Sequence, residues 1–283
     1  MTQLFRPLSA LFLALLIAGP ASAQVTVVIV GGDKADITID IPIDDDESIS
    51  ADMEVEFENP VNLTAECLNV SAVVLDAAAI NAINARLPTP LGRFDIDPLF
   101  PLLITIEPLP ACNLQFDNQI EFEIHTEELS YNFPSPYRLM KAPVTGTFRD
   151  VTANVLSGSI RANGSGGTFS EFVIARNVVV DLNGDALAGF ADLESRINGA
   201  DLSLLARNVL TEDLASARAA YERGFFTDSI SRLQAMVLTT RSLGGGAIPN
   251  RWRSERDLVN AVGEIKGLTD ALAYRIARVA NLP

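Results

Sequence analysis

The first half of the chain alternates apolar and polar residues with the period of β-strands. Residues 25–30 (VTVVIV) form a continuous β-branched run that ends at Gly31-Gly32. Residues 35–41 (ADITIDI) and 53–57 (MEVEF) alternate strictly, which is the pattern of a strand with one buried face. We therefore expect half-buried strands in all three segments.

Further short strands and a single helix are expected up to residue 175. The strand-like runs are 102–106, 120–125, 129–132, 144–148, 154–162 and 168–175. Residues 75–87 carry apolar side chains at helical spacing and end before Pro88, which predicts an inserted helix. The sequence NGSGG at 163–167 supplies the positive φ of tight turns, so we expect a hairpin there. Many short strands with one helix predict an Ig-like β-sandwich.

From Phe190 onward the hydrophobic period becomes helical. Helices are expected at 193–197 and 202–210, and two more within 211–241, joined by a turn at 223–226. Thr211 and Thr227 are the expected N-caps of that pair, and Gly224 is expected to end its first helix.

A last helix is expected to begin at a capping box formed by Ser254 and Asp257. Its apolar positions recur every three or four residues: Leu258, Val262, Ile265, Leu272, Ile276 and Val279. Such a stripe packs along another helix, so the sequence predicts a three- to four-helix bundle. The expected organisation is α+β with two domains, an acidic β-sandwich at 24–185 and a helical bundle at 186–283.

The N-terminal 23 residues have the pattern of a secretory signal peptide. Arg6 precedes an apolar run at 8–18, and Ala21-Ser22-Ala23 forms a small-x-small cleavage site. Cleavage between Ala23 and Gln24 would leave a mature chain with no segment long enough to span a membrane. We therefore expect a secreted or periplasmic protein.

Two cysteines, Cys67 and Cys112, are the only ones in the sequence. An even count in an exported chain favours a disulfide, with two separate buried thiols as the alternative. A two-cysteine metal site is disfavoured because the chain has one histidine and no CxxC spacing.

Charge divides the chain unevenly. Residues 24–185 hold 25 acidic and 8 basic residues, whereas 186–283 hold 11 acidic and 12 basic ones. The acidic part disfavours nucleic acid and anionic membranes as partners, since both need a positive field. Trp252 stands among three arginines, which favours docking of the bundle onto the acidic part over simple Arg–Trp stacking.

No firm cofactor motif is present, and calcium is the one ion that the sequence suggests. The four candidate ligands follow the spacing of an EF-hand-like loop: Asp181, Asn183, Asp185 and Asp192. The loop glycine expected at the sixth position is replaced by Ala186, and the alternative is a polar turn that caps the following helix.

Catalytic motifs are absent from the sequence. His125 is the only histidine, and neither a GxSxG elbow nor an HExxH motif occurs. Paired carboxylates for glycoside hydrolysis remain open, because the acidic residues are many and their separations are not visible in sequence.

Three stretches resemble known families. Ala217-x-x-Ala220-Tyr221-x-x-Gly224 resembles the helix–turn–helix of tetratricopeptide-type repeats, and residues 202–279 resemble the C-terminal FIMAH modules of secreted bacterial proteins. Residues 137–174, with YRLMKAP and GTFSEFVI, resemble an uncharacterised family of secreted bacterial proteins, which implies no activity.

Two classes of function follow. The first is an exported non-catalytic protein that acts in binding, adhesion or surface assembly through its acidic sandwich, with an unknown protein or glycan at the cell exterior. The alternative is an extracytoplasmic polysaccharide hydrolase or carbohydrate-binding module that uses carboxylates of the acidic domain. The hydrolase would need a cleft with two carboxyl groups about 5 to 10 Å apart.

Overall fold

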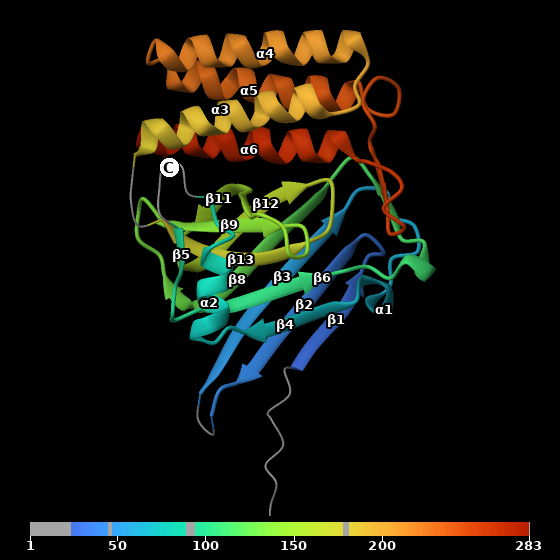
Figure 1. Cartoon of the computed structure of the whole chain (residues 1–283), viewed down its shortest axis with the longest axis vertical. Coiled ribbons are helices and arrows are strands. Elements are labelled where there is room, and N and C mark those ends of the chain that lie inside the picture. The colour runs from blue at the N-terminus through green and yellow to red at the C-terminus, as the bar shows by residue number, and fades with distance from the viewer. Residues whose placement is uncertain (1–23, 45–46, 89–93, 178–180, 283) are drawn as a thin grey trace, which may run out of the picture.

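The computed structural model describes residues 24–44, 47–88, 94–177 and 181–282. They form a mixed α+β fold of antiparallel sheets and six helices, four of which follow residue 181 (Figure 1). The expected signal peptide lies outside the described residues, and the first strand begins at Gln24, the residue expected to start the mature chain.

The first sheet has six antiparallel strands in the order β1-β2-β3-β8-β12-β11. Their bounds are β1 Gln24–Val30, β2 Lys34–Pro42, β3 Ser48–Phe57, β8 Ile120–Ser130, β11 Thr152–Leu156 and β12 Ser159–Gly166. In β2 and β3 buried and solvent-facing side chains alternate, as the sequence pattern predicted. The strands expected at 25–30, 35–41 and 53–57 are confirmed, and β8 joins two expected runs into one strand.

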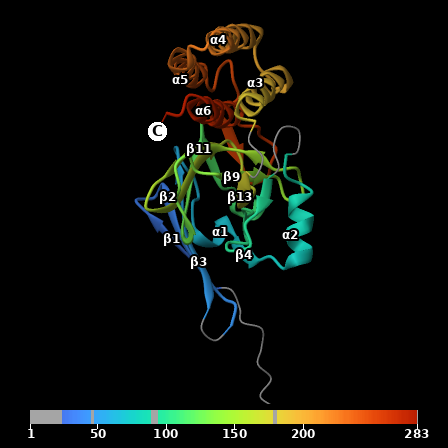
Figure 2. The ribbon, with the colours of Figure 1, turned by 90° about the vertical axis from the view of Figure 1, so that its left-hand side faces the viewer.

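The second sheet has the order β10-β9-β13-β6-β4, and β5 pairs with β13 beside β6. Their bounds are β4 Val70–Val74, β5 Phe94–Ile96, β6 Leu102–Ile106, β9 Tyr137–Ala142, β10 Arg149–Asp150 and β13 Glu171–Asn177. Figure 2 shows β1, β2 and β3 on one side of the sheet region and β4 on the other. Both sheets contribute to one hydrophobic core, where the rings of Phe122 and Phe172 lie 4.8 Å apart.

Two short helices accompany the sheets. Helix α1 (Ala65–Leu68) precedes β4, and α2 (Ala77–Asn84) follows it, within the range 75–87 expected to be helical. Asp76 caps α2 by accepting a hydrogen bond from the N–H of Ala79. The side chain of Ile83 packs in a separate core cluster with Met140 and Val173 of the second sheet, so α2 covers that sheet from outside.

Two expectations within the strand region are wrong. Residues 144–148 contain a turn, in which the N–H of Gly146 donates to the carbonyl of Pro143. The expected hairpin at 163–167 is also wrong: Gly164 and Gly166 lie within β12, and the turn occurs at Gly158, whose φ is 115°. Strands β12 and β13 therefore belong to different sheets.

Four long helices lie together at one end of the sheets (Figures 1 and 2). Their bounds are α3 Leu182–Gly199, α4 Leu204–Glu222, α5 Phe226–Ser242 and α6 Ala261–Val279. Gly224 has a φ of 79° at the turn between α4 and α5, as expected. Helix α6 is the one nearest the sheets, and it packs against β12 and β11.

Two expected N-caps are wrong. Thr211 lies inside α4, because buried side chains recur at helical spacing from Ala206 to Tyr221 and Ser203 caps the helix. Thr227 lies inside the first turn of α5, which starts at Phe226 with no side-chain cap.

The capping box expected at 254–257 does not start the last helix. Arg256 has a φ of 59°, which is incompatible with a helix, and Asp257 forms an ion pair with Arg253 instead. Asn260 caps α6 by accepting from the N–H of Gly263. The helix therefore starts after Leu258, the first position of the expected stripe.

The C-terminal part of the chain returns to the sheets before α6. Strand β14 (Arg251–Arg253) pairs with β7 (Gln115–Asp117), and the Trp252 ring stacks on Phe116 at 5.3 Å. Two of the arginines around Trp252 also form ion pairs with the acidic part, namely Arg251 with Asp117 at 2.7 Å and Arg256 with Glu107 at 2.8 Å. The segment around Trp252 thus docks the helical part onto the sheets, and the expected boundary at 185/186 falls in the first turn of α3.

Glycines permit the close approach of α6 to β12. A Cβ on Gly267 would lie 2.3 Å from the carbonyl oxygen of Ser165, and one on Gly263 would lie 2.4 Å from that of Asn118. On the facing side, a Cβ on Gly167 would lie 2.4 Å from the carbonyl oxygen of Asn260. Gly167 therefore serves this contact between backbones, whereas Gly164, within β12, lies against the carbonyl of Val151.

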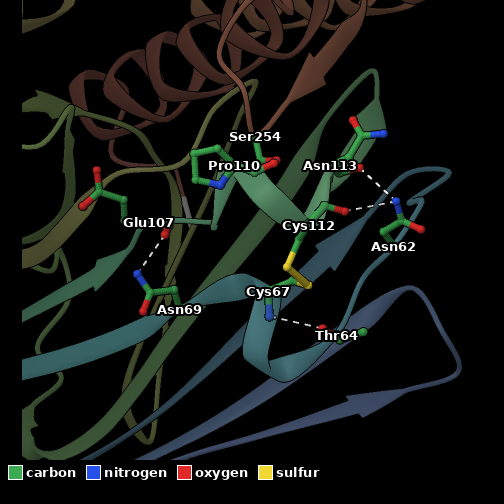
Figure 3. The surroundings of a disulfide bond; sticks show 9 residues. All are labelled: Asn62, Thr64, Cys67, Asn69, Glu107, Pro110, Cys112, Asn113 and Ser254. Carbon is green, nitrogen blue, oxygen red and sulfur yellow. Dashed lines mark hydrogen bonds between the residues drawn. A yellow bond between two sulfur atoms is a disulfide. The ribbon is translucent and has the colours of Figure 1, made fainter.

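A disulfide joins Cys67 and Cys112, which are 45 positions apart in sequence (Figure 3). It links α1 to the single 3₁₀ turn Pro110–Cys112. Asparagine side chains hold the same two segments: Asn62 donates to the carbonyls of Cys112 and Asn113, and Asn69 donates to the carbonyl of Glu107 (Figure 3). None of the described helices has a stretch long and apolar enough to cross a membrane.

Candidate functional site

The outer face of the six-stranded sheet carries most of its carboxylates. Side chains on β2, β3 and β8 alternate between the core and this face, because successive residues of a strand point to opposite sides. We call this surface the acidic face, and its carboxylates are Asp36, Asp40, Asp52, Glu54, Glu56, Glu121 and Glu123.

The strand register places like charges directly opposite each other. In one row across the sheet, Asp36 lies directly opposite Glu54, and Glu54 lies directly opposite Glu123. In the next row, Glu56 pairs with Glu121. Directly opposed like charges destabilise a sheet, so this arrangement is unfavourable for folding alone.

Few cations balance the acidic face. The Nζ of Lys34 lies 2.9 Å from carboxylate oxygens of both Asp36 and Glu54, and hydrogen bonds to these two groups raise the pKa of Lys34 to about 12. Arg161 of β12 pairs with Glu123 at 2.8 Å, and the Nζ of Lys266 lies 3.5 Å from Glu121. The carboxylates nevertheless stay open to solvent, since the side chains of Asp52 and Glu54 are 61% and 53% exposed.

A hollow of about 290 Å³ opens at one end of the acidic face. The acidic side chains that line it are Glu54, Glu56, Glu121, Glu123 and Asp270. Lys266 of α6 also lines it and pairs with Asp270 at 2.7 Å. The carboxylates lie on the outside of the sheet, whereas the space between the two sheets is filled by the hydrophobic core.

The four candidate calcium ligands do not converge on one point. Asp181 caps α3 by accepting from the N–H of Gly184, and Asn183 accepts from the hydroxyl of Tyr221. Asp185 lies 3.8 Å from Arg275, and Asp192, with a 60% exposed side chain, lies 4.0 Å from the same guanidinium, so a cation of the protein already faces both carboxylates. Burial raises the pKa of Asp185, against the opposing effect of Arg275.

The candidate calcium ligands stay apart because residues 182–199 form one continuous helix, whereas an EF-hand-like site needs a loop that surrounds the ion. Within the described residues, no three His, Cys, Asp or Glu side chains are grouped so as to hold a metal ion. The geometry here is that of a capped helix N-terminus.

His125 lies on the acidic face. Its Nε2 is 2.6 Å from the hydroxyl of Ser159, and its Nδ1 is 3.7 Å from Asp52. It sits directly opposite Asp52 and Arg161 in the strand register, so it forms part of the row of charged side chains.

Charged residues that the sequence analysis missed lie between the sheets and the helices. Lys141 of β9 pairs with Glu264 of α6 at 3.3 Å. Asp150 lies 3.7 Å from Arg138 and 3.6 Å from Arg275, and all three side chains are at most 8% exposed. The available signal was the presence of Arg138 and Lys141 inside the otherwise apolar run YRLMKA.

Glu264 is strongly held in its ionised form. Burial acts to raise its pKa, but Lys141, Arg196, the N–H of Gly167 and the hydroxyl of Thr168 together lower it to about 2, from an ordinary 4.5. Because the folded pKa is depressed, the ionised carboxylate stabilises the fold above pH 4.5, and this contribution disappears as pH falls toward 2.

We therefore expect Glu264→Gln to lower the free energy of unfolding at pH 7 by up to about 3 kcal/mol. The free energy of unfolding of the variant should also change less between pH 7 and low pH than that of wild type. Urea unfolding at pH 7, at 4.5 and at the lowest pH where the protein folds would measure both effects. Glu255→Gln is the matched control, since the Glu255 side chain is 52% exposed. An acid dependence that is equally steep in Glu264→Gln and wild type would contradict the expectation.

The fold and the acidic face define a mixed α+β protein with a carboxylate-rich sheet surface. The chain belongs to a family of unknown function, DUF6689, whose model matches residues 11–280. The match covers both sheets and all four long helices, and it supports the expectation that the chain belongs to an uncharacterised family. A search of curated proteins finds no match.

Proposed function

We propose that this chain is an exported, non-catalytic binding protein whose acidic face binds a protein partner with a cationic surface at the cell exterior. Export is supported by the signal-peptide pattern at residues 1–23 and is compatible with the disulfide between Cys67 and Cys112. The scaffold is a β-sandwich, capped by a four-helix bundle that resembles the C-terminal modules of secreted bacterial proteins.

The observation that carries the proposal is the register of carboxylates across β2, β3 and β8. Asp36, Glu54 and Glu123 lie opposite one another in one row, and Glu56 lies opposite Glu121 in the next. Their mutual repulsion is offset only in part, because three cations, Lys34, Arg161 and Lys266, lie among these five carboxylates. A binding surface explains why such a row is present, because a cationic partner would turn the repulsion into attraction. Side chains that lower stability are typical of functional surfaces, because function and stability trade off against each other.

An apolar strip beside the carboxylates supports a protein partner over a glycan. Val28 and Val30 of the edge strand β1 lie opposite Asp36 and Lys34, and they are 52% and 44% exposed. Protein surfaces offer apolar and cationic side chains side by side, whereas a neutral glycan offers no charge for the acidic face. The filled core and the external position of the carboxylates favour binding over hydrolysis in a deep cleft.

The test compares two variants that remove the same charge from different places. The face variant changes Glu54, Glu56, Glu121 and Glu123 to Gln. The control variant carries Glu66→Gln, Glu194→Gln, Asp201→Asn and Glu212→Gln, which are exposed positions outside the six-stranded sheet. Binding to a lysine decamer is measured by calorimetry at low and at physiological salt.

We expect the face variant to bind the decamer at least about ten-fold more weakly and with a smaller salt dependence, because local charge pairs set the affinity. The control variant should stay within about two-fold of wild type. Equal weakening in the two variants would show that net charge alone attracts the peptide, and would refute the proposal.

A further inference from the structure

A second, oppositely charged site lies between the second sheet and the helices. It is a cavity of about 480 Å³, which we call the seam pocket. Its charged and hydroxyl lining comes from β9, β10, α3, α6 and the loops beside them, and includes Lys141, Thr147, Arg149, Ser170, Arg196 and Glu264.

Three cations in the seam pocket face a single carboxylate. Glu264 already has three hydrogen-bond partners: its Oε1 accepts from the Nζ of Lys141, from the N–H of Gly167 and from the hydroxyl of Thr168. That carboxylate neutralises Lys141. Among the described residues, no carboxylate lies within 4.0 Å of the guanidinium of Arg149 or Arg196, so two positive charges remain.

Two further observations indicate that these cations lack a partner. The Nε of Arg196 is buried, and no hydrogen-bond acceptor meets it within the described part of the chain. A buried donor left unpaired is costly, and it is commonly satisfied by a ligand or water. In addition, Arg149 lies directly opposite Lys141 in the pairing of β10 with β9, which places like charges side by side.

The positive charge of the seam pocket contrasts with the negative net charge of the molecule. The chain carries a net charge of −15, and the acidic face is strongly negative. A locally positive cavity with partly buried walls concentrates an anion that the remainder of the surface would repel. The cavity volume lies within the range of small-molecule sites.

We propose that the seam pocket binds a small, hydroxyl-bearing organic oxyanion of up to two negative charges. Guanidinium groups bind carboxylate and phosphate oxygens through paired N–H donors, so Arg149 and Arg196 hold the charged group. The hydroxyls of Thr147 and Ser170 line the same cavity and pair with the hydroxyls of the ligand. A carboxylate and a phosphate share this chemistry, and the probes below distinguish them.

The test is calorimetric titration of the purified protein with tartrate, with inorganic phosphate and with threitol, which has the carbon chain of tartrate but no charge. Wild type should bind at least one of the two anions and not threitol. Tartrate as the tighter ligand identifies a carboxylate site, and phosphate as the tighter ligand identifies a phosphate site.

Variants locate the binding. Arg149→Gln and Arg196→Gln are each expected to weaken anion binding by about ten-fold or more. Arg149 is exposed at the mouth of the pocket, so its variant keeps the test valid if Arg196→Gln folds poorly. Arg218→Gln and Arg232→Gln on the bundle surface are the controls, and the face variant should still bind the anion because its substitutions lie outside the seam pocket.

The inference is overturned by any of three results. These are no heat of binding with either anion at about 10 mM, a concentration at which even a weak site fills, binding of threitol as tight as that of the tighter anion, or unchanged affinity for that anion in both arginine variants. A wild-type protein that binds the anion but not the lysine decamer would contradict only the function proposed for the acidic face.

Discussion

The double variant Gly263→Ala/Gly267→Ala is expected to lose about 5 kcal/mol of unfolding free energy. Each new methyl group would lie within 2.4 Å of a carbonyl oxygen of Asn118 or Ser165, and a backbone atom cannot yield as the end of a side chain can. The helix would have to move away from β12. Overpacking of this kind costs about 2 to 3 kcal/mol at each position, although alanine favours a helix more than glycine does.

Gly199→Ala is the matched control for this prediction. Gly199 also lies in a helix, but a Cβ there meets no atom within 4 Å and its φ is not positive. That variant should therefore be neutral or more stable by up to about 1 kcal/mol. Chemical denaturation of the three proteins measures the difference, and a double variant as stable as Gly199→Ala would show that the close contact between α6 and β12 does not form.

Removal of the disulfide by Cys67→Ala/Cys112→Ala is expected to lower the unfolding free energy by about 4 kcal/mol. The bond closes a loop of 45 residues, and in the chain-entropy model this restricts the unfolded chain by that amount. In the folded state it holds α1 against the turn at 110–112, next to the strand pair β7–β14 that carries Trp252.

Reduction provides the control. Dithiothreitol should lower the denaturation midpoint of wild type to that of the double variant and leave the double variant unchanged. The residual hydrogen bonds from Asn62 and Asn69 should keep the local segments in place, so the variant should retain its circular dichroism spectrum at low temperature. A wild-type midpoint that does not respond to complete reduction would contradict the prediction.

The two parts of the chain are coupled by the contacts described above. Trp252 packs into the hydrophobic core shared by the sheets, and α6 packs on β12 and β11. In the glycine double variant and in the cysteine double variant, the helices and the sheets should therefore unfold in one transition. Unfolding curves from near-ultraviolet and far-ultraviolet circular dichroism should then coincide.

The sequence by itself predicted the type of most elements and identified the two cysteines that could form a disulfide. Alternation at 35–41 and 53–57 requires a strand with one buried face, and the helical period after Phe190 requires packed helices, because both patterns follow from local geometry. Gly224 was identifiable because a positive φ at a helix end depends on its neighbours in sequence. With only two cysteines, a disulfide could join no pair other than Cys67 and Cys112, and the structure decided between this bond and two separate thiols.

Tertiary structure decided what depends on contacts between distant segments. The glycines at 163–167 predict a turn locally, but Gly164 lies against the carbonyl of Val151 and Gly167 lies against the start of α6, so their small size serves contacts with distant segments. The alternation around Glu54 and Glu123 was visible in each strand, whereas their opposition exists only once β3 pairs with β8. The seam pocket is the clearest case, because Arg149 and Arg196 are 47 residues apart and line one cavity only in the folded chain. A local pattern specifies which way a side chain points, and only the packed chain specifies what it faces.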